Sequence, residues 1–241
     1  MEESLDRQAP RSLVAQTFAR LFFKRATVAG NEAVADGFRL LTLHTPFDDA
    51  RHWPPGQVLH LRVGAFQSRT YTLIPAGPEG GDLRFLAFLH GHGPGSDWAA
   101  SARPGAACEF RLPQRSMNLE RFGDALLVFG DETSFGLAAA ATRAGIATRC
   151  IFEVDDVPRA AQALAAIGVR DASLFARSAG HGHLAQAAQV LREAAAGPCT
   201  FVLTGQAASI QQMHRVLKSE GLPAARIRTQ AYWAPGKTGM D

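Results

Sequence analysis

Cysteine is scarce in this chain, and its spacing excludes several kinds of redox centre. The three cysteines are Cys108, Cys150 and Cys199, and they form no Cys-x-x-Cys pair and no Cys-x-x-Cys-His haem attachment. The sequence therefore predicts neither a disulfide framework nor an iron–sulfur cluster. If the chain carries out redox chemistry, it must pass its electrons to an external ligand or partner.

Long apolar runs and a strong charge of one sign are also missing. No segment approaches the roughly twenty apolar residues of a membrane span, and the acidic, polar N-terminus lacks the regions of a secretory signal. The net charge of +3 and the pI of about 9.0 are too weakly basic for a nucleic-acid-binding protein but suit anionic small molecules. We therefore expect a cytoplasmic protein with no nucleic-acid partner and no stable membrane insertion.

Constellations typical of metal sites and of acid–base catalysis do not occur either. Two His-x-His pairs are present, His90 with His92 and His181 with His183, but neither has a third ligand at metal-site spacing. No catalytic triad and no pair of catalytic carboxylates stands out. We therefore predict no bound metal ion and no side chain acting as a catalytic acid or base.

The two halves of the chain differ in their pattern of hydrophobic residues. Its 241 residues fit two domains of about 120 residues better than one. From residue 24 to about residue 110, short alternating segments separated by glycine and proline turns predict a small antiparallel barrel. The expected strands are residues 38–44, 58–63, 70–74, 83–89 and 108–112. An amphipathic pattern at residues 13–23 predicts a helix that docks on the protein's own core rather than on a membrane surface.

From residue 125 onward, apolar runs alternate with alanine-rich helical stretches. This alternation predicts βαβ units and a parallel sheet, so the fold class is a β-barrel followed by an α/β domain. We place the barrel domain, with its N-terminal helix, at residues 1–118 and the α/β domain, with a C-terminal tail, at residues 119–241. A linker is expected at about residues 113–123.

Ligands of open parallel sheets bind beyond the carboxyl ends of the strands, where loops lead into helices. Two loops occupy that position, Gly130-Asp131-Glu132-Thr133 and Thr204-Gly205-Gln206. They are the expected walls of a nicotinamide nucleotide site, although neither is a Gly-x-Gly-x-x-Gly fingerprint. The alternative is a plain strand-to-helix turn in which Thr133 is the N-cap.

Two segments of the first half together suggest a flavin site. In Arg69-Thr70-Tyr71-Thr72, the arginine can neutralise a phosphate, the aromatic ring can lie against a flat cofactor, and a threonine can hydrogen-bond a ring nitrogen. The later turn, from His90 through Gly93, Pro94, Gly95 and Ser96, opens a helix and presents backbone N–H groups to a pyrophosphate. The alternatives are a surface ion pair for Arg69, an ordinary strand aromatic for Tyr71, and a helix cap at Ser96 for a helix over residues 97–101.

The order of these segments resembles the ferredoxin-NADP reductase superfamily and, within it, the siderophore-interacting proteins, also called ferric siderophore reductases. The segments that carry the resemblance are RTYT (69–72), FLAFLHGHGPGSDWAASARPG (85–105), LPQRSMN (112–118), FGDETSFGLA (129–138), FVLTGQAASIQQMHRVL (201–217) and AYWAPGKTG (231–239). The Gly-Asp-Glu-Thr loop and the closing Tyr-Trp-x-x-Gly point to the siderophore branch. The chain departs from the family pattern at Ser134-Phe135-Gly136 and at Leu73-Ile74-Pro75.

The resemblance implies an FAD-dependent oxidoreductase that takes hydride from NADH or NADPH and reduces ferric siderophores, releasing Fe(II). Arg69 would hold the FAD phosphates, Tyr71 would pack on the isoalloxazine or ribityl region, and Thr72 would face the reactive edge of the flavin. The two loops at residues 130–133 and 204–206 would bind the nicotinamide nucleotide. The preference between NADH and NADPH stays open, because Arg149 and Arg177 could be contacts to a 2′-phosphate or ordinary surface charges.

An anionic ferric siderophore would be attracted to cations near the flavin, and the candidates are Arg115, Arg228 and Lys237. The alternative for these residues is ordinary solvated charge. Two other functions are compatible with the sequence. One is a general NAD(P)H-dependent flavin or ferredoxin-type reductase with a protein partner, and the other is a siderophore-binding protein that has lost its flavin.

Overall fold

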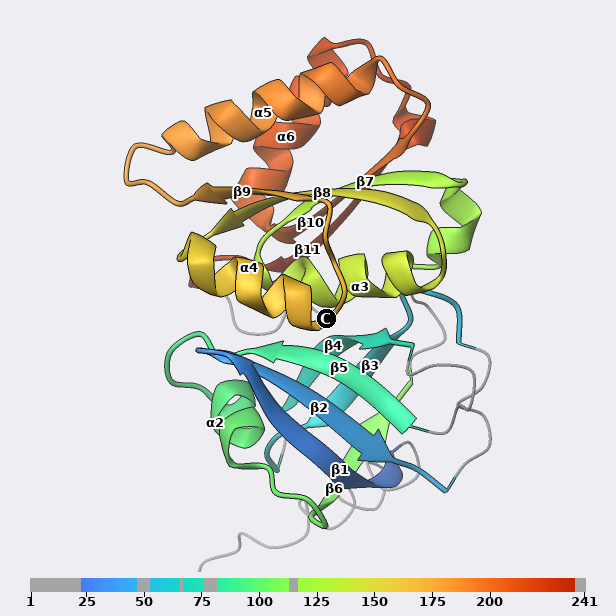
Figure 1. The fold of residues 1–241 in the computed structure, drawn as a ribbon, viewed down its shortest axis with the longest axis vertical. Coiled ribbons are helices and arrows are strands. Elements are labelled where there is room, and N and C mark those ends of the chain that lie inside the picture. Colours follow the sequence, from blue (N-terminus) through green and yellow to red (C-terminus); the bar gives the residue numbers. More distant parts are fainter. Residues whose placement is uncertain (1–22, 47–52, 66, 76–81, 113–116, 237–241) are drawn as a thin grey trace, which may run out of the picture.

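A closed barrel and a parallel sheet covered by helices lie one against the other (Figure 1). The computed structural model describes residues 23–46, 53–65, 67–75, 82–112 and 117–236. The fold class predicted from the sequence, a β-barrel followed by an α/β unit, is confirmed. The predicted helix at residues 13–23 lies almost entirely outside the described residues. No described helix combines the length and apolar character needed to cross a membrane.

The barrel has six strands in the order β1-β2-β5-β4-β3-β6, with antiparallel neighbours throughout, and it closes where β6 pairs with β1. Alternate residues of the strands point inward and form an apolar core that includes Leu41, Leu59, Leu83, Phe85 and Phe110. The helix α2 (Pro94–Ser101) connects β5 to β6. The barrel strands are β1 (Lys24–Ala35), β2 (Phe38–His44), β3 (Val58–Arg62), β4 (Ser68–Ile74), β5 (Asp82–Phe88) and β6 (Ala107–Arg111).

The second sheet is entirely parallel, with strand order β11-β10-β7-β8-β9. The chain reverses its direction across the sheet between β7 and β10, and this is the position at which open α/β sheets bind ligands. Helices α3 and α4 cover the face toward the barrel, and α5 and α6 cover the other face (Figure 1). The strands are β7 (Ala125–Gly130), β8 (Ala147–Val154), β9 (Ala172–Ala176), β10 (Thr200–Gln206) and β11 (Ile227–Trp233), and the helices are α3 (Phe135–Arg143), α4 (Val157–Ala166), α5 (Gly182–Ala195) and α6 (Ala207–Ser219).

Two strands, β1 and β11, were not predicted from the sequence. In β1, register shifts near Val28 and Ala33 break the alternation of inward and outward residues that reveals a strand. The segment expected to be a C-terminal tail contains β11, an edge strand whose residues are mostly half-buried or exposed. The predicted domain boundary between residues 118 and 119 stays a prediction. The remaining described elements are the short 3₁₀ helices η2 (Leu119–Phe122), η3 (Glu132–Ser134) and η4 (Ala224–Arg226).

A seam of aromatic rings joins the barrel to the α/β unit. Phe135, at the start of α3, stacks on Phe38 of the barrel with centroids 5.6 Å apart, and it also contacts Phe152 of β8 at 4.8 Å. Next to it, a side chain at Gly136 would come within 3.3 Å of the Thr72 carbonyl oxygen. The two halves therefore share one continuous apolar core, and glycine at position 136 lets α3 approach β4 closely.

We predict that Phe135→Ala lowers the free energy of unfolding by about 4 kcal/mol, because the fully buried ring leaves a cavity in the shared core. Chemical denaturation followed by circular dichroism measures this loss. Phe122→Ala is the matched control, since Phe122 is only half-buried, and it should cost about 1 to 2 kcal/mol. Equal losses in the two variants would show that the contacts of Phe135 with Phe38 and Phe152 stabilise the protein no more than an ordinary partly buried contact does.

Candidate functional site

The structure brings together the two barrel segments that suggested a flavin site. Arg69 and Tyr71 lie two residues apart on β4 and therefore share one face of the strand. The N-terminal turn of α2 packs against them, because a side chain at Gly95 would lie 2.8 Å from Cγ of Arg69 and 3.3 Å from the hydroxyl of Tyr71. Only glycine allows the helix to come this close. Thr70 and Thr72 occupy the other face of β4.

The electrostatics of this corner suit an anion. The Arg69 guanidinium donates a hydrogen bond to the carbonyl oxygen of Ser68 at 2.8 Å, and it makes no ion pair with any carboxylate among the described residues. The N-cap of α2, Gly93, offers no side-chain cap, and Pro94 has no N–H, so the N–H groups of Gly95 and Ser96 have no acceptor within the helix. A cation and a helix N-terminus thus meet at one place.

Ser96 does not cap a helix at residues 97–101, and that alternative is wrong. The helix begins three residues earlier than expected, at Pro94, and Ser96 is buried within its first turn. Proline is favourable at the first helical position because its ring already holds a helical φ. His90 is exposed at the start of the turn, with its ring 5.9 Å from that of Phe88.

Tyr71 stacks on Phe85 of the barrel core, with ring centroids 4.6 Å apart. Burial raises the pKa of Tyr71 to about 12, although the nearby Arg69 charge acts in the opposite direction. The phenol is therefore neutral at any physiological pH, and its ring is fixed from one side by the barrel.

Tyr232 of β11 links the barrel to the parallel sheet. Burial raises the pKa of Tyr232, while hydrogen bonds to the side chains of Thr72 and Thr204 lower it in part. Thr72 belongs to the predicted flavin segment and Thr204 to the predicted nucleotide loop, so one hydroxyl connects the two candidate sites. Tyr232 was not among the predicted site residues, and its place in the Tyr-Trp-x-x-Gly segment was the signal that could have identified it.

The two predicted nucleotide loops meet at the carboxyl ends of β7 and β10. Thr204 donates a hydrogen bond to the Ser134 hydroxyl at 2.8 Å. A side chain at Gly130 would collide with Ser134, and one at Gly205, where φ is +92°, would lie 2.5 Å from a carboxylate oxygen of Asp131. Both glycines are therefore required by close contacts at this edge, whatever ligand the edge binds.

The turn after β7 is capped by Asp131 and not by Thr133, so the alternative in which Thr133 is the N-cap is wrong. The Asp131 carboxylate accepts a hydrogen bond from the backbone N–H of Thr133 at 2.9 Å and one from Trp233 Nε1 at 2.7 Å. The Thr133 hydroxyl also donates to it. Asp131 is fully buried. An aspartate can accept several such bonds at once, whereas a threonine hydroxyl offers a single oxygen.

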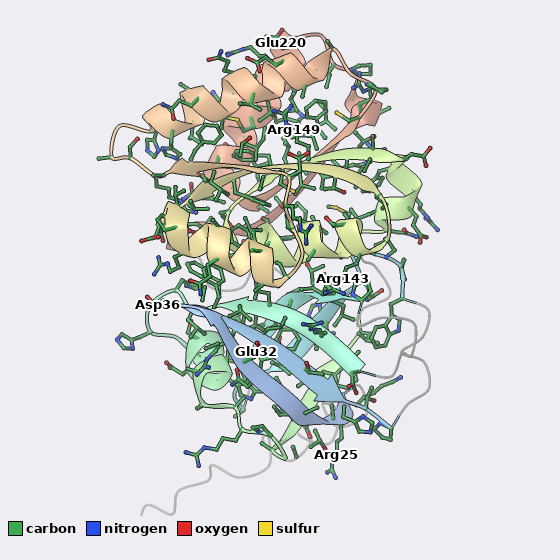
Figure 2. The ribbon with its side chains drawn as sticks, viewed as in Figure 1. Arg25, Glu32, Asp36, Arg143, Arg149 and Glu220 are labelled. Atoms are coloured by element: carbon green, nitrogen blue, oxygen red, sulfur yellow. The ribbon has the colours of Figure 1, made fainter. Side chains whose placement is uncertain are left out.

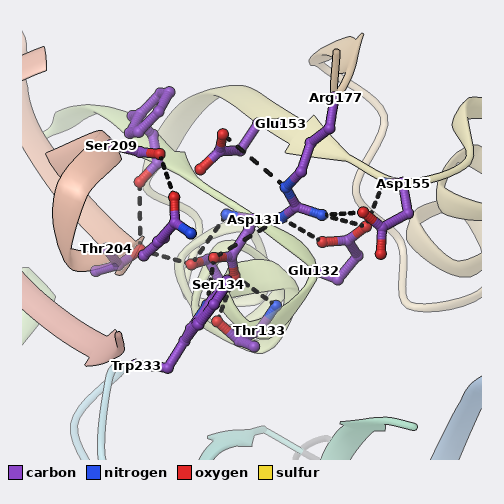
Figure 3. A network of polar contacts seen from close by, with 12 residues as sticks. Asp131, Glu132, Thr133, Ser134, Glu153, Asp155, Arg177, Thr204, Ser209 and Trp233 are labelled. Carbon is purple, nitrogen blue, oxygen red and sulfur yellow. Dashed lines mark hydrogen bonds and ion pairs between the residues drawn. The ribbon is translucent and has the colours of Figure 1, made fainter. Parts of the chain in front are cut away.

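Arg177 lies at the centre of an acidic cluster, which we define as Asp131, Glu132, Glu153 and Asp155 (Figure 3). Its guanidinium donates to Glu132 at 2.9 Å and to Asp155 at 2.5 Å, and it lies 4.0 Å from both Asp131 and Glu153. Glu132 also accepts a hydrogen bond from the backbone N–H of Asp155 at 2.6 Å. These contacts tie together the ends of β7, β8 and β9.

The acidic cluster is held at a cost in desolvation. Burial raises the pKa of Asp131 and of Glu132, and hydrogen bonds and the Arg177 charge oppose that rise. Burial acts to lower the pKa of Arg177, but Glu132 and Asp155 raise it above its ordinary value, so the guanidinium stays charged. Arg177 is therefore neither a free phosphate contact nor an ordinary surface charge. Arg149 is exposed on the sheet face away from the barrel (Figure 2).

His183 approaches the same cluster from α5. Its ring makes a 3.0 Å contact with Glu153 and accepts a hydrogen bond from the Ser178 backbone N–H at 3.2 Å. The other oxygen of Glu153 has no hydrogen-bond partner in the described part of the chain. Within the described ranges, no group of three or more histidine, cysteine, aspartate or glutamate side chains could hold a metal ion.

Of the three predicted substrate-binding cations, the structure describes Arg228 alone. Arg115 and Lys237 lie outside the described residues. Arg228 lies at the amino end of β11, where it donates to the carbonyl oxygens of Ala224 at 3.3 Å and Ile227 at 3.1 Å and stacks over Phe122. Because the strands are parallel, this end of the sheet is opposite the end that carries the nucleotide loops.

Comparison with known proteins agrees with this architecture. Residues 123–236 match the family model described as siderophore-interacting protein. A siderophore utilization protein from T. fusca is 20% identical, with a TM-score of 0.71 over 91% of this chain and 95% of its own. The siderophore-interacting protein SipS from Aeromonas hydrophila is 18% identical, with a TM-score of 0.69 over 90% and 93% of the two chains. No curated protein matches the sequence.

A phthalate dioxygenase reductase has the same arrangement, with 17% identity and a TM-score of 0.71 over 91% of this chain and 71% of its own. The shared fold defines the class, which is ferredoxin-reductase-like. Within that class, the resemblance to siderophore-interacting proteins that the motifs predicted is confirmed by the family match over the α/β half.

The two tyrosines of the chain give a spectroscopic prediction. Folding raises the pKa of Tyr71 from 10.0 to about 12 and raises that of Tyr232 as well, so tyrosinate absorbance should develop near pH 10 in the unfolded chain but only well above it in the folded protein. Because the unfolded state loses these protons first, stability should fall as the pH rises from 10 through 12. Tyr71→Phe should remove the tyrosinate transition that occurs at the lower pH in the folded protein. Ordinary titration near pH 10 in the folded protein would contradict this assignment.

Arg177→Met should destabilise the protein by about 3 to 5 kcal/mol, because it leaves buried carboxylates without their cation. Without Arg177, the pKa of Asp131 and of Glu132 rises further, so the loss should be smaller at acidic pH, where both groups take up protons. Urea denaturation at two pH values measures both effects. Arg149→Met, which removes an exposed arginine, should change stability by no more than about 0.5 kcal/mol.

Proposed function

We propose that this protein is an FAD-dependent NAD(P)H oxidoreductase that reduces ferric siderophores and releases Fe(II). The observation that carries the proposal is the packing of Gly95 against Arg69 and Tyr71, in a chain whose α/β half matches the siderophore-interacting family. The ferredoxin-reductase-like neighbours support an oxidoreductase that uses a pyridine nucleotide, since one of them is described as transferring electrons from pyridine nucleotides. The cytoplasmic location expected from the sequence stays a prediction.

The barrel residues fit FAD in their chemistry. A diphosphate needs a cation and backbone donors, and Arg69 and the start of α2, from Gly93 to Ser96, supply both. Arg69 is free to pair with an external anion because no carboxylate neutralises it within the described residues. Tyr71 supplies a rigid aromatic ring against which a flat ring system can lie. A bound FAD would convert a two-electron donor into one-electron steps.

The nucleotide would bind at the carboxyl ends of β7 and β10. The loop from Gly130 to Thr133 and the pair Thr204 and Gly205 line this edge, and the close contacts of both glycines shape it. The position is the switch point of the sheet, where open α/β sheets bind nucleotides. Tyr232 and Thr72 lie between this edge and the barrel, which is where hydride transfer must take place.

In this scheme the chain's own residues bind and orient the flavin, the nucleotide and the ferric chelate. None of them has to exchange a proton with the substrate. One NAD(P)H supplies two electrons, so it reduces two ferric ions by one electron each. The product Fe(II) binds hard oxygen donors more weakly than Fe(III), which releases the metal from its chelate. Arg115 and Lys237 are the proposed contacts for the anionic chelate. Arg228 is a weaker candidate because it lies at the opposite end of the sheet.

The proposal is tested with the full-length protein loaded with FAD under anaerobic conditions. We expect it to retain flavin absorbance after gel filtration, to lose that absorbance on addition of NADH or NADPH, and to recover it with a ferric hydroxamate or catecholate faster than with a ferredoxin. Arg69→Met should weaken FAD binding by at least about tenfold. Arg103→Met, an exposed change beyond the other end of α2, should not. A protein that stays colourless with excess FAD would refute the proposal.

A further inference from the structure

The position of Asp155 is informative about the nucleotide. Asp155 directly follows β8, the strand next to β7 on the side away from β10. In dinucleotide-binding sheets of this kind, an acidic residue about 20 residues beyond the first loop, at the end of the second strand, accepts a hydrogen bond from the ribose 2′-hydroxyl. The Asp155 side chain is 54% exposed, so it is accessible from outside the protein.

The acidic cluster leaves no free cation at this end of the described sheet. Arg177 and Arg159 of α4 both lie at this end, and the donors of Arg177 face Glu132 and Asp155 at 2.5 to 3.3 Å. Four carboxyl groups surround the Arg177 guanidinium, and the His183 ring contacts one of them, Glu153, so carboxyl groups outnumber basic side chains in the cluster, although burial favours protonation of Asp131 and Glu132. Arg159, the first basic residue after Asp155 in the sequence, makes an ion pair with Asp36 of the barrel at 3.6 Å.

On the basis of the proposed function, we infer that this enzyme selects NADH over NADPH and that Asp155 is the residue that determines this specificity. One oxygen of Asp155 is bonded to Arg177, and a carboxylate keeps further acceptor sites that can take the ribose 2′-hydroxyl. A 2′-phosphate at the same place would bring close to two negative charges against the acidic cluster. The Arg177 guanidinium would have to leave its carboxylates to compensate, and that would leave buried charges unpaired.

The inference is tested by isothermal titration of the full-length protein with ADP-ribose and with 2′-phospho-ADP-ribose. These probes lack the nicotinamide ring, so their binding does not depend on hydride transfer or on a ferric substrate. We expect ADP-ribose to bind at least about tenfold more tightly. Asp155→Asn keeps the shape and removes the charge, and it should reduce this preference by about tenfold, mainly by improving binding of the phosphorylated probe. The dissociation constants for NADH and NADPH should follow the same order.

Asp124→Asn is the matched control, because Asp124 is an exposed aspartate just before β7, at the amino end of the same sheet. It should leave the preference between the two probes unchanged. Equal binding of both probes to the wild type, or a preference that Asp155→Asn does not alter, would overturn the inference while leaving the proposed function intact. Failure of both probes and both nucleotides to bind would overturn the proposed function together with the inference.

Discussion

The packing of α3 on the barrel is the constraint on which the candidate site depends. Phe135 is fully buried between Phe38 of the barrel and Phe152 of the sheet, and Gly136 brings the helix backbone to β4. Hydride transfer between two ligands requires their reacting atoms to be held within contact distance. One half of the protein carries the proposed anion-binding corner and the other carries the proposed nucleotide edge. A shared core, rather than a flexible linker, therefore sets their separation.

A second constraint is electrostatic and acts within the sheet. Asp131 and Glu132 are buried acids, and burying them is tolerable because Arg177, Trp233 and backbone N–H groups satisfy their oxygens. The same contacts hold the loops after β7, β8 and β9 in fixed relative positions. The loop that replaces a glycine-rich fingerprint is thus shaped by its acidic side chains and their partners. An edge built in this way carries carboxyl groups where NADP-binding sheets of this kind place an arginine near the 2′-phosphate.

Local patterns in the sequence predicted the alternation of strands and helices in the second half and the pairing of Arg69 with the turn at Gly95. The first follows from strand and helix periodicity, and the second follows from the cation and the helix N-terminus that a diphosphate needs. The partners of Arg177 were not predictable, because they converge from the ends of three strands and only the sheet order brings them together. The strand β11 and the bulged β1 lacked a clear alternation, so their pairing depends on neighbours distant in sequence.

The distribution of charge across the site follows from these contacts. Arg69 lies on the barrel side and the acidic cluster with Arg177 lies on the sheet side, whereas the groups between them, Tyr232, Thr72 and Thr204, are neutral hydroxyls. Because burial raises the pKa of Tyr232, its phenol does not ionise at physiological pH. Charged groups can therefore bind phosphates and ribose at the periphery while the centre stays uncharged. A centre without ionised side chains suits hydride transfer, because the hydride passes directly between the two ligands and needs no protein group to donate or accept a proton.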